Sequence, residues 1–257
     1  MGGAIIRGLL ASGASKSADI TVADPREDVL DALAEEFPGI NAVRDNGEAA
    51  KASILILAVK PQVYESVIAG IRGAVPADTV VATIAAGVSI AAASSWFGGR
   101  GKIVRTMPNT PAMVSEGMTA LCPGPDVSES ELEAVRRVFD AVGRTVILPE
   151  SQIDAYTSLA GSSPAWVFMF IEALADGAVR EGIPRQTAYA VAAQAVLGSA
   201  KLAAESGVHP GELKDRVCSP GGTTIEAVAT LEEAGFRSAV IRAVADCTAK
   251  AKELGGK

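Results

Sequence analysis

Three short segments of the chain combine polar side chains with Pro or Gly at spacings that suit ligand binding. The first is Ala58-Val59-Lys60-Pro61, at the end of the uniformly apolar run 53–59. In doubly wound sheets, ligands bind just beyond the carboxyl ends of the strands, where a Lys can reach a phosphate or a carboxamide. The alternative is a solvated Lys next to a Pro that starts a helix.

The second segment is Arg105-Thr-Met-Pro-Asn-Thr-Pro-Ala112. Its two prolines fix their own φ angles and restrict the residues before them, so the loop is expected to be rigid. A rigid polar loop after a strand suits the positioning of a substrate. A stiff turn with a purely structural role is the alternative.

The third segment runs from Lys214 to Glu226 and contains Gly221 and Gly222 just before a helix predicted to begin near Thr223. Unpaired backbone N–H groups and the helix dipole make such a start attractive to an anion. With the Thr224 hydroxyl beside it, the segment could hold a small carboxylate. An ordinary capped helix start is the alternative, because Ser and Thr favour those positions.

Other catalytic patterns are missing from the sequence. Cys122, Cys218 and Cys247 lie far apart, without the short pairs that zinc sites use, and we expect them to be small buried side chains in a reducing compartment. The single histidine, His209, precedes Pro210 and is expected to approach a helix start rather than to act in catalysis. We therefore expect no metal site and no Ser-His-Asp triad.

Up to about residue 150 the sequence alternates strand-like and helix-like runs. Apolar β-branched runs predict strands, and apolar residues at helical spacing predict the helices between them. Ser128 and Glu131 have the spacing of a capping box at the start of the last of these helices. Such alternation implies a parallel α/β sheet, and uniformly apolar strands imply burial on both faces. The predicted strands are 19–23, 53–59, 78–84 and 102–105, and the predicted helices are 26–37, 63–71 and 128–142.

After residue 150 the strand-like runs end, and four Ala-rich helices are predicted at 153–180, 185–205, 223–234 and 236–254. The run 189–198 is apolar almost all round, so a helix there must be buried on all sides. A helical domain of this size cannot bury it alone, which predicts an intertwined, obligate oligomer. We therefore divide the chain into an α/β domain, 1–150, and an all-helical domain, 151–257.

Composition excludes several classes of protein. The chain of 257 residues has 49% hydrophobic residues, which excludes a mainly disordered state. Its 23 Lys and Arg stand against 30 Asp and Glu, a net charge of −7, with no basic run, so no nucleic-acid partner is expected. No uninterrupted apolar run reaches the roughly 18–20 residues that a membrane span requires. We expect a soluble cytoplasmic protein without a membrane partner.

The chain closely resembles the pyrroline-5-carboxylate reductase family, which catalyses the last step of proline biosynthesis. The resemblance extends from Gly2 to near the C-terminus. It rests on the following segments, of which the last is the most specific: Ala58-Val-Lys-Pro61, Ile84-Ala-Ala-Gly87, Met107-Pro-Asn-Thr-Pro111, Gly161-Ser-Ser-Pro-Ala165, His209-Pro-Gly-Glu-Leu-Lys-Asp215 and Ser219-Pro-Gly-Gly-Thr-Thr-Ile-Glu226.

This resemblance implies a Rossmann-like doubly wound sheet followed by an all-helical substrate-binding and dimerisation domain, and homodimers that assemble into decamers. It implies hydride transfer from NADPH or NADH to the C=N carbon of 1-pyrroline-5-carboxylate, giving L-proline. Such a reaction requires face-to-face positioning, while the redox chemistry belongs to the cofactor.

The resemblance also implies roles for individual residues. The backbone amides of Gly222, Thr223 and Thr224 would hold the substrate carboxylate, with Ser163 as a further substrate contact. The Thr224 hydroxyl would act in catalysis by orienting the imine nitrogen and helping its protonation. The implied cofactor contacts are Gly2, Asp24, Arg26, Asn46, Ala58, Val59, Lys60, Pro61, Ala85, Ala86, Gly87 and Asn109.

The start of the chain departs from the family pattern. Gly2 resembles the last glycine of the phosphate-binding turn, and the first strand and the leading glycines are missing. That strand would lie mid-sheet, so its neighbours would keep unpaired backbone groups that cost about 1–3 kcal/mol each. We therefore expect a misassigned start or a trimmed chain, with about a dozen residues lost. A protein that truly begins at Met1 is expected to bind the cofactor poorly.

Two residues make opposite predictions for the cofactor. Asp24 ends the predicted strand 19–23, where an acid would bind a ribose 2′-hydroxyl and favour NAD(H). Arg26 could instead pair with a 2′-phosphate. Family habit favours NADP(H), with NAD(H) as the alternative. Besides the reductase, two functions stay open: a non-catalytic oligomeric scaffold, and a related nicotinamide enzyme that acts on another small acid or imine.

Overall fold

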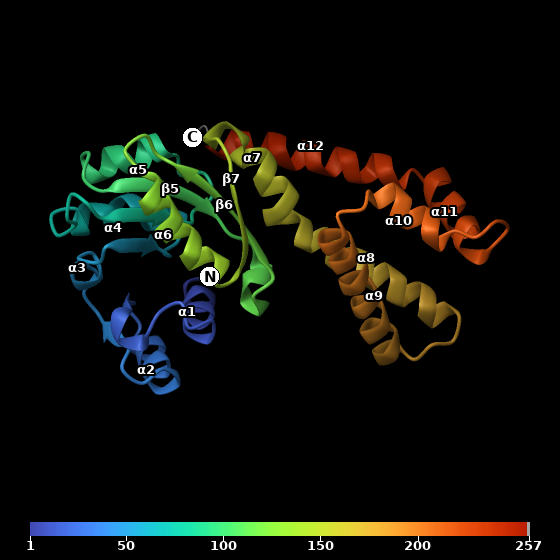
Figure 1. Cartoon of the computed structure of the whole chain (residues 1–257), viewed down its shortest axis with the longest axis horizontal. Coiled ribbons are helices and arrows are strands. Elements are labelled where there is room, and N and C mark those ends of the chain that lie inside the picture. Colours follow the sequence, from blue (N-terminus) through green and yellow to red (C-terminus); the bar gives the residue numbers. More distant parts are fainter. Residues whose placement is uncertain (256–257) are drawn as a thin grey trace. The chain divides into compact units, whose positions relative to one another are not determined.

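The computed structural model describes residues 1–255, and the chain divides into two compact units (Figure 1). The first unit comprises Met1–Ser162 and the chain from Cys247 onward, and the second comprises Ser163–Asp246. The sequence instead predicted one boundary after residue 150. The last helical turns belong to the first unit because Thr248 Oγ1 donates to Ser158 Oγ at 2.9 Å and Cys247 Sγ lies 3.3 Å from Ser162 Oγ.

A five-stranded sheet forms the centre of the first unit, in the order β3 (Ile54–Leu57), β4 (Val80–Thr83), β5 (Lys102–Met107), β6 (Gly117–Pro123) and β7 (Gly143–Ile147). The first three strands are parallel, which confirms the predicted βαβ pattern. The predicted parallel α/β sheet is confirmed as the dominant arrangement, with one exception: β6 runs antiparallel to β5. A chain turning back through a short loop can make this pairing, whereas a parallel one needs a longer crossover.

The strands β1 (Thr21–Ala23) and β2 (Asn41–Val43) form a separate parallel pair. The doubly wound fold has the strand order 3-2-1-4-5-6, in which its strand 1 lies between strands 2 and 4. In this chain β1 and β3 occupy the places of strands 2 and 4 of that order. The break between β1 and β3 falls at that position, so one edge of β1 and one edge of β3 have no strand partner among the described residues. The fold is therefore Rossmann-like, with its sheet in two parts.

Helices cover both faces of the larger sheet. Successive residues of a strand point to opposite faces. Val81 accordingly packs with side chains of α4 (Tyr64–Ile71) and α5 (Ile90–Phe97), while Val80 and Ala82 pack with α1 (Gly2–Ala11) and α6 (Glu129–Asp140). Burial on both faces is complete for β4, whereas Ile54 and Ile56 of β3 stay partly exposed. The helices α2 (Glu27–Glu36) and α3 (Asn46–Ala49) accompany the smaller sheet.

Several local predictions are confirmed. Ser128 caps α6, its hydroxyl accepting from the Glu131 N–H while the Glu131 carboxylate accepts from the Ser128 N–H. His209 caps a helix start: its Nδ1 accepts from the Gly211 N–H at 3.1 Å, at the beginning of α10 (Pro210–Val217). The expected burial of the cysteines holds for Cys122 only, because Cys218 and Cys247 are partly exposed.

The second unit is helical, as predicted. It consists of α8 (Ser163–Arg180), α9 (Arg185–Ser206), α10, α11 (Thr223–Glu233) and most of α12 (Phe236–Gly255). The predicted helix 153–180 is present as one helical run, in which a π-helical turn at Thr157–Ser162 joins α7 (Ile153–Tyr156) to α8. The sequence predicted a helix start after His209 but not the extent of α10, whose Pro210 occupies the first helical position.

This unit leaves much apolar surface exposed. α8 and α9 pack together, with only Ala175 on α8 and Ala188 and Ala192 on α9 buried. Met169 and Ile241 are 66% and 69% exposed. By length and composition alone, the helical run Glu150–Arg180 could span a membrane. An apolar surface of this extent marks a site of interaction.

Candidate active site

Loops that follow three neighbouring strands lie at one edge of the larger sheet. Because β3, β4 and β5 run parallel, their carboxyl ends share that edge. Residues 58–61 follow β3, residues 85–87 follow β4, and Asn109 follows β5. The structure therefore gathers these predicted cofactor residues at one edge. Thr83, at the end of β4, carries a buried hydroxyl with no hydrogen-bond partner among the described residues, an open polar position at the same edge.

Tyr64 joins the ends of β3 and β4. Its buried hydroxyl donates to the Leu57 carbonyl at 2.5 Å and accepts from the Ile84 N–H at 3.1 Å. Burial raises the pKa of Tyr64 to about 12, although the backbone N–H groups of Ile84 and Ala85 oppose that rise. The phenol therefore keeps its proton near neutral pH and holds the residues that precede both loops.

The start of α1 lies against the end of β3. A Cβ placed on Gly2 would come within 3.1 Å of the Ala58 Cβ, so glycine permits this approach. Met1 provides no side-chain cap, the first turn has no acidic residue, and the first helical bonds come from Ala4 and Ile5. The N–H groups of Gly2 and Gly3 are therefore directed out of the helix start. These residues fit the pyrophosphate of a dinucleotide.

Asp24 and Arg26, which make opposite predictions for the choice between NAD(H) and NADP(H), both follow β1. The Arg26 N–H donates to Asp24 Oδ1 at 2.9 Å, and Arg26 Nε lies 3.6 Å from the same oxygen. The Arg26 side chain is 66% exposed and that of Asp24 is 31% exposed, and ion pairs near the surface are worth about 0–1 kcal/mol. A ligand can therefore recruit either the carboxylate or the guanidinium.

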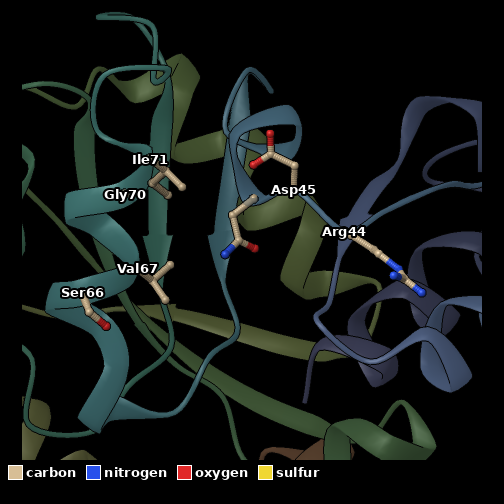
Figure 2. A pocket seen from close by; sticks show the side chains of 7 residues that line it. Arg44, Asp45, Ser66, Val67, Gly70 and Ile71 are labelled. Atoms are coloured by element: carbon tan, nitrogen blue, oxygen red, sulfur yellow. The ribbon is translucent and has the colours of Figure 1, made fainter.

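Asn46 lines a pocket of about 340 Å³ between the start of α3 and α4 (Figure 2). Asp45 caps α3 by accepting from the Gly47 N–H at 2.8 Å, which fixes the position of Asn46 after β2. The Arg44 side chain extends away from α4 (Figure 2). It forms an ion pair with Glu27. The full lining is Arg44, Asp45, Asn46, Ser66, Val67, Gly70 and Ile71.

Asn109 fastens the loop after β5. Its Nδ2 donates to the Ala160 carbonyl, in the π-helical turn, at 3.0 Å, and its Oδ1 accepts from the Met118 N–H at 2.9 Å. The rigidity expected from the two prolines is thus reinforced by contacts to the π-helical turn and to β6. The Nδ2 group donates one hydrogen bond among the described residues, so its second N–H is open to a ligand. Its contact with the cofactor stays a prediction.

A carboxylate joins the start of α5 to β5. Glu150 Oε1 accepts from the Ile90 N–H at 2.8 Å, at the start of α5, and lies 3.0 Å from Arg105 Nη1. Arg105 is only 8% exposed. The buried guanidinium is therefore neutralised by the residue that also satisfies a helix N-terminus. The sequence did not predict the roles of Glu150 and Tyr64, because each bonds to backbone or side-chain groups that are distant from it in the sequence.

The predicted substrate residues lie in the second unit. α11 begins at Thr223, which confirms the predicted helix start. Its N-cap residue, Gly222, provides no side-chain hydrogen bond. Gly221 has φ +66°, and a Cβ on Gly222 would overlap Ser219 Oγ, so this turn requires glycine. Ser163 is the first residue of α8. The site roles of these residues stay predictions.

Two family profiles match the chain. One is described as pyrroline-5-carboxylate reductase dimerisation and matches residues 150–254. The other is described as NADP oxidoreductase coenzyme F420-dependent and matches residues 1–87. Pyrroline-5-carboxylate reductase of Escherichia coli is 48% identical over 255 residues, covering 99% of this chain and 94% of the relative.

Solved structures agree with the sequence comparisons. A pyrroline-5-carboxylate reductase from Coxiella burnetii matches with a TM-score of 0.91 and 32% identity, over 98% of this chain and 93% of that one. Pyrroline carboxylate reductase from Plasmodium falciparum, solved with NADP bound, matches with a TM-score of 0.86 and 29% identity, over 99% of this chain and 94% of that one.

Proposed function

The chain belongs to the pyrroline-5-carboxylate reductase family, and from this premise we infer that it reduces 1-pyrroline-5-carboxylate to L-proline, the last step of proline biosynthesis. It is an NAD(P)H-dependent oxidoreductase acting on a C=N bond. The observation that carries this conclusion is 48% identity to one such reductase over 99% of the chain, which includes both units.

NADP(H) is the favoured cofactor, with NAD(H) as the second candidate. When bound, the reduced nicotinamide supplies the hydride. In our proposal the N–H groups at the start of α1, at Gly2, bind the pyrophosphate, and Asp24, Arg26 and Asn46 contact the adenosine half. Residues 58–61, residues 85–87 and Asn109 then line the nicotinamide half. The open helix start and the shared strand edge support this assignment.

On the substrate side, the backbone amides of Gly222, Thr223 and Thr224 hold the carboxylate, and Ser163 adds a contact. The Thr224 hydroxyl donates to the ring nitrogen. Reduction adds a hydride to the imine carbon and a proton to the nitrogen, so a donor at this nitrogen promotes the reaction. The uncapped start of α11 supports the carboxylate assignment, because its first N–H groups are available to an anion.

The helical unit mediates homo-oligomerisation, in keeping with the family profile that covers it. We propose a homodimer that assembles into a decamer, with the exposed apolar residues of α8, α9 and α12 covered by other copies of the chain. That covering also accounts for the apolar run Glu150–Arg180 without a membrane. The proposed location is the cytoplasm, and neither a nucleic acid nor a membrane is a partner.

The decisive experiment follows NADPH oxidation in the presence of pyrroline-5-carboxylate. Thr224→Ala is expected to lower kcat by about a hundredfold, the lower end of what a proton donor contributes, while NADPH binding is preserved. Thr224→Ser keeps the hydroxyl and is the matched control. Absence of turnover by the wild-type chain would overturn the reductase assignment, whereas normal turnover by Thr224→Ala would overturn only the role of Thr224.

A further inference from the structure

We propose that Tyr64 is a positioning residue for the cofactor, whose hydroxyl sets the separation between residues 58–61 and residues 85–87. The inference rests on the proposed function, in which these two loops line the nicotinamide half of the cofactor. Tyr64 touches the residue before each loop: it donates to Leu57 and accepts from Ile84.

The Tyr64 hydroxyl occupies the position of one backbone hydrogen bond between β3 and β4. The Val80 N–H donates to the Ser53 carbonyl at 2.9 Å, and the strands continue in register to Leu57 and Thr83. Because hydrogen bonds of a parallel ladder recur every second residue, the same pattern would place the Ile84 N–H against the Leu57 carbonyl. Instead, the Tyr64 oxygen lies between these two groups and bonds to each. The two strands therefore part by the width of one inserted oxygen at the point where the cofactor loops begin.

The surrounding structure holds the hydroxyl in place. Tyr64 is 0% exposed, at the first position of α4, and belongs to the same buried cluster as Ile68 and Phe97. The loop that starts at Ala58 leads directly into it, through a turn in which the Val63 N–H donates to the Lys60 carbonyl. The bond from Tyr64 to Leu57 thus closes residues 58–63 into a loop fixed at both ends.

Loss of the hydroxyl changes this geometry whichever way the strands relax. Either the Ile84 N–H closes onto the Leu57 carbonyl, or both groups lose their partner. In the first case the starts of both loops move together, and in the second their separation is no longer fixed, while the aromatic ring continues to fill the core. Small displacements of positioning groups cost up to about a hundredfold in rate. We expect Tyr64→Phe to reduce kcat/KM for NADPH about tenfold or more, mainly through a higher Kd for NADPH.

The test compares direct binding of NADPH with binding of adenosine 2′,5′-bisphosphate, a probe of the adenosine half only. Tyr64→Phe should weaken NADPH binding about tenfold and leave the bisphosphate and the KM for the imine within about twofold. Ile68→Val is the matched control, because it disturbs the same helix and core without touching the loops; its NADPH binding should match that of the wild type. Incorporation of 4-aminophenylalanine at position 64, which restores a donor and an acceptor, should restore NADPH binding.

The outcomes separate the two claims. If the wild-type chain does not bind NADPH, the proposed function fails and this inference fails with it. If the wild type binds NADPH and Tyr64→Phe binds it equally well, only the inference is overturned. The inference would also be overturned if Tyr64→Phe lost affinity for NADPH, the bisphosphate and the imine alike. It would be overturned too if Ile68→Val lost as much NADPH affinity as Tyr64→Phe, since either result indicates general destabilisation.

Discussion

Replacement of Glu150 by Ala removes the carboxylate that joins the start of α5 to β5. It leaves the guanidinium of Arg105, a residue 8% exposed, without its acidic partner, and the Ile90 N–H without its acceptor. Breaking a buried ion pair in this way costs about 3–5 kcal/mol. The lower end applies because the Glu150 side chain is 33% exposed. The lost Ile90 bond adds about 1 kcal/mol, so we expect a loss of about 4 kcal/mol.

Thermal unfolding followed by circular dichroism measures this loss. For a chain of this size, about 1 kcal/mol corresponds to about 2–4 °C in Tm, so Glu150→Ala should melt about 8–16 °C below the wild type. Protein concentration must be held constant, because oligomerisation makes Tm concentration-dependent. Glu150→Gln keeps an acceptor for the Ile90 N–H but not the charge, so it should recover about 1 kcal/mol of the loss, about 2–4 °C in Tm.

A double variant tests the cause of the effect. Arg105→Met combined with Glu150→Ala removes the unpaired buried charge and should melt higher than Glu150→Ala alone, because apolar replacement of a buried pair is often neutral. The reasoning would be refuted if Glu150→Ala melted within about 2 °C of the wild type. Strict additivity of the two single variants would refute it as well.

Two further predictions concern stability. The Lys102 ammonium, with help from Ser128, lowers the pKa of Glu131 from its ordinary 4.5 to about 2. The Glu131 contribution to folding is complete above about pH 4.5 and is lost as the pH falls towards 2. Urea unfolding should therefore show a stability gap between wild type and Glu131→Gln that shrinks over that range; a gap independent of pH would contradict this. Gly8→Ala should lower the unfolding free energy by about 1–3 kcal/mol, because its Cβ would overlap Val142 and lie 2.7 Å from the Ala141 carbonyl. Gly70→Ala, with no atom within 4 Å of its Cβ, should instead raise it by about 0.5–1 kcal/mol; equal effects of the two substitutions would contradict the packing argument.

The sequence by itself determined the elements whose signals are local. The Ser128 and Glu131 spacing predicted the start of α6, and the glycines before Thr223 predicted the start of α11. The buried run 78–84 predicted β4, which pairs with parallel strands on both sides. Each of these signals arises from residues within one or two turns of one another, so periodicity and capping chemistry suffice to read it. The motifs of the family resemblance are equally local, and they placed the cofactor loops at strand ends.

Only the tertiary structure decided the features that depend on distant partners. Glu150 meets Arg105 and Ile90 across 45 and 60 residues, and no spacing in the sequence specifies such a pair. The same holds for Tyr64, which sequence patterning treats as one more apolar position of a helix, although its hydroxyl joins two strands. The antiparallel β6 and the packing of Thr248 on Ser158 likewise follow from chain reversal and docking. These contacts form only when the chain is folded, because their geometry is set by the sheet and its helices rather than by neighbouring residues.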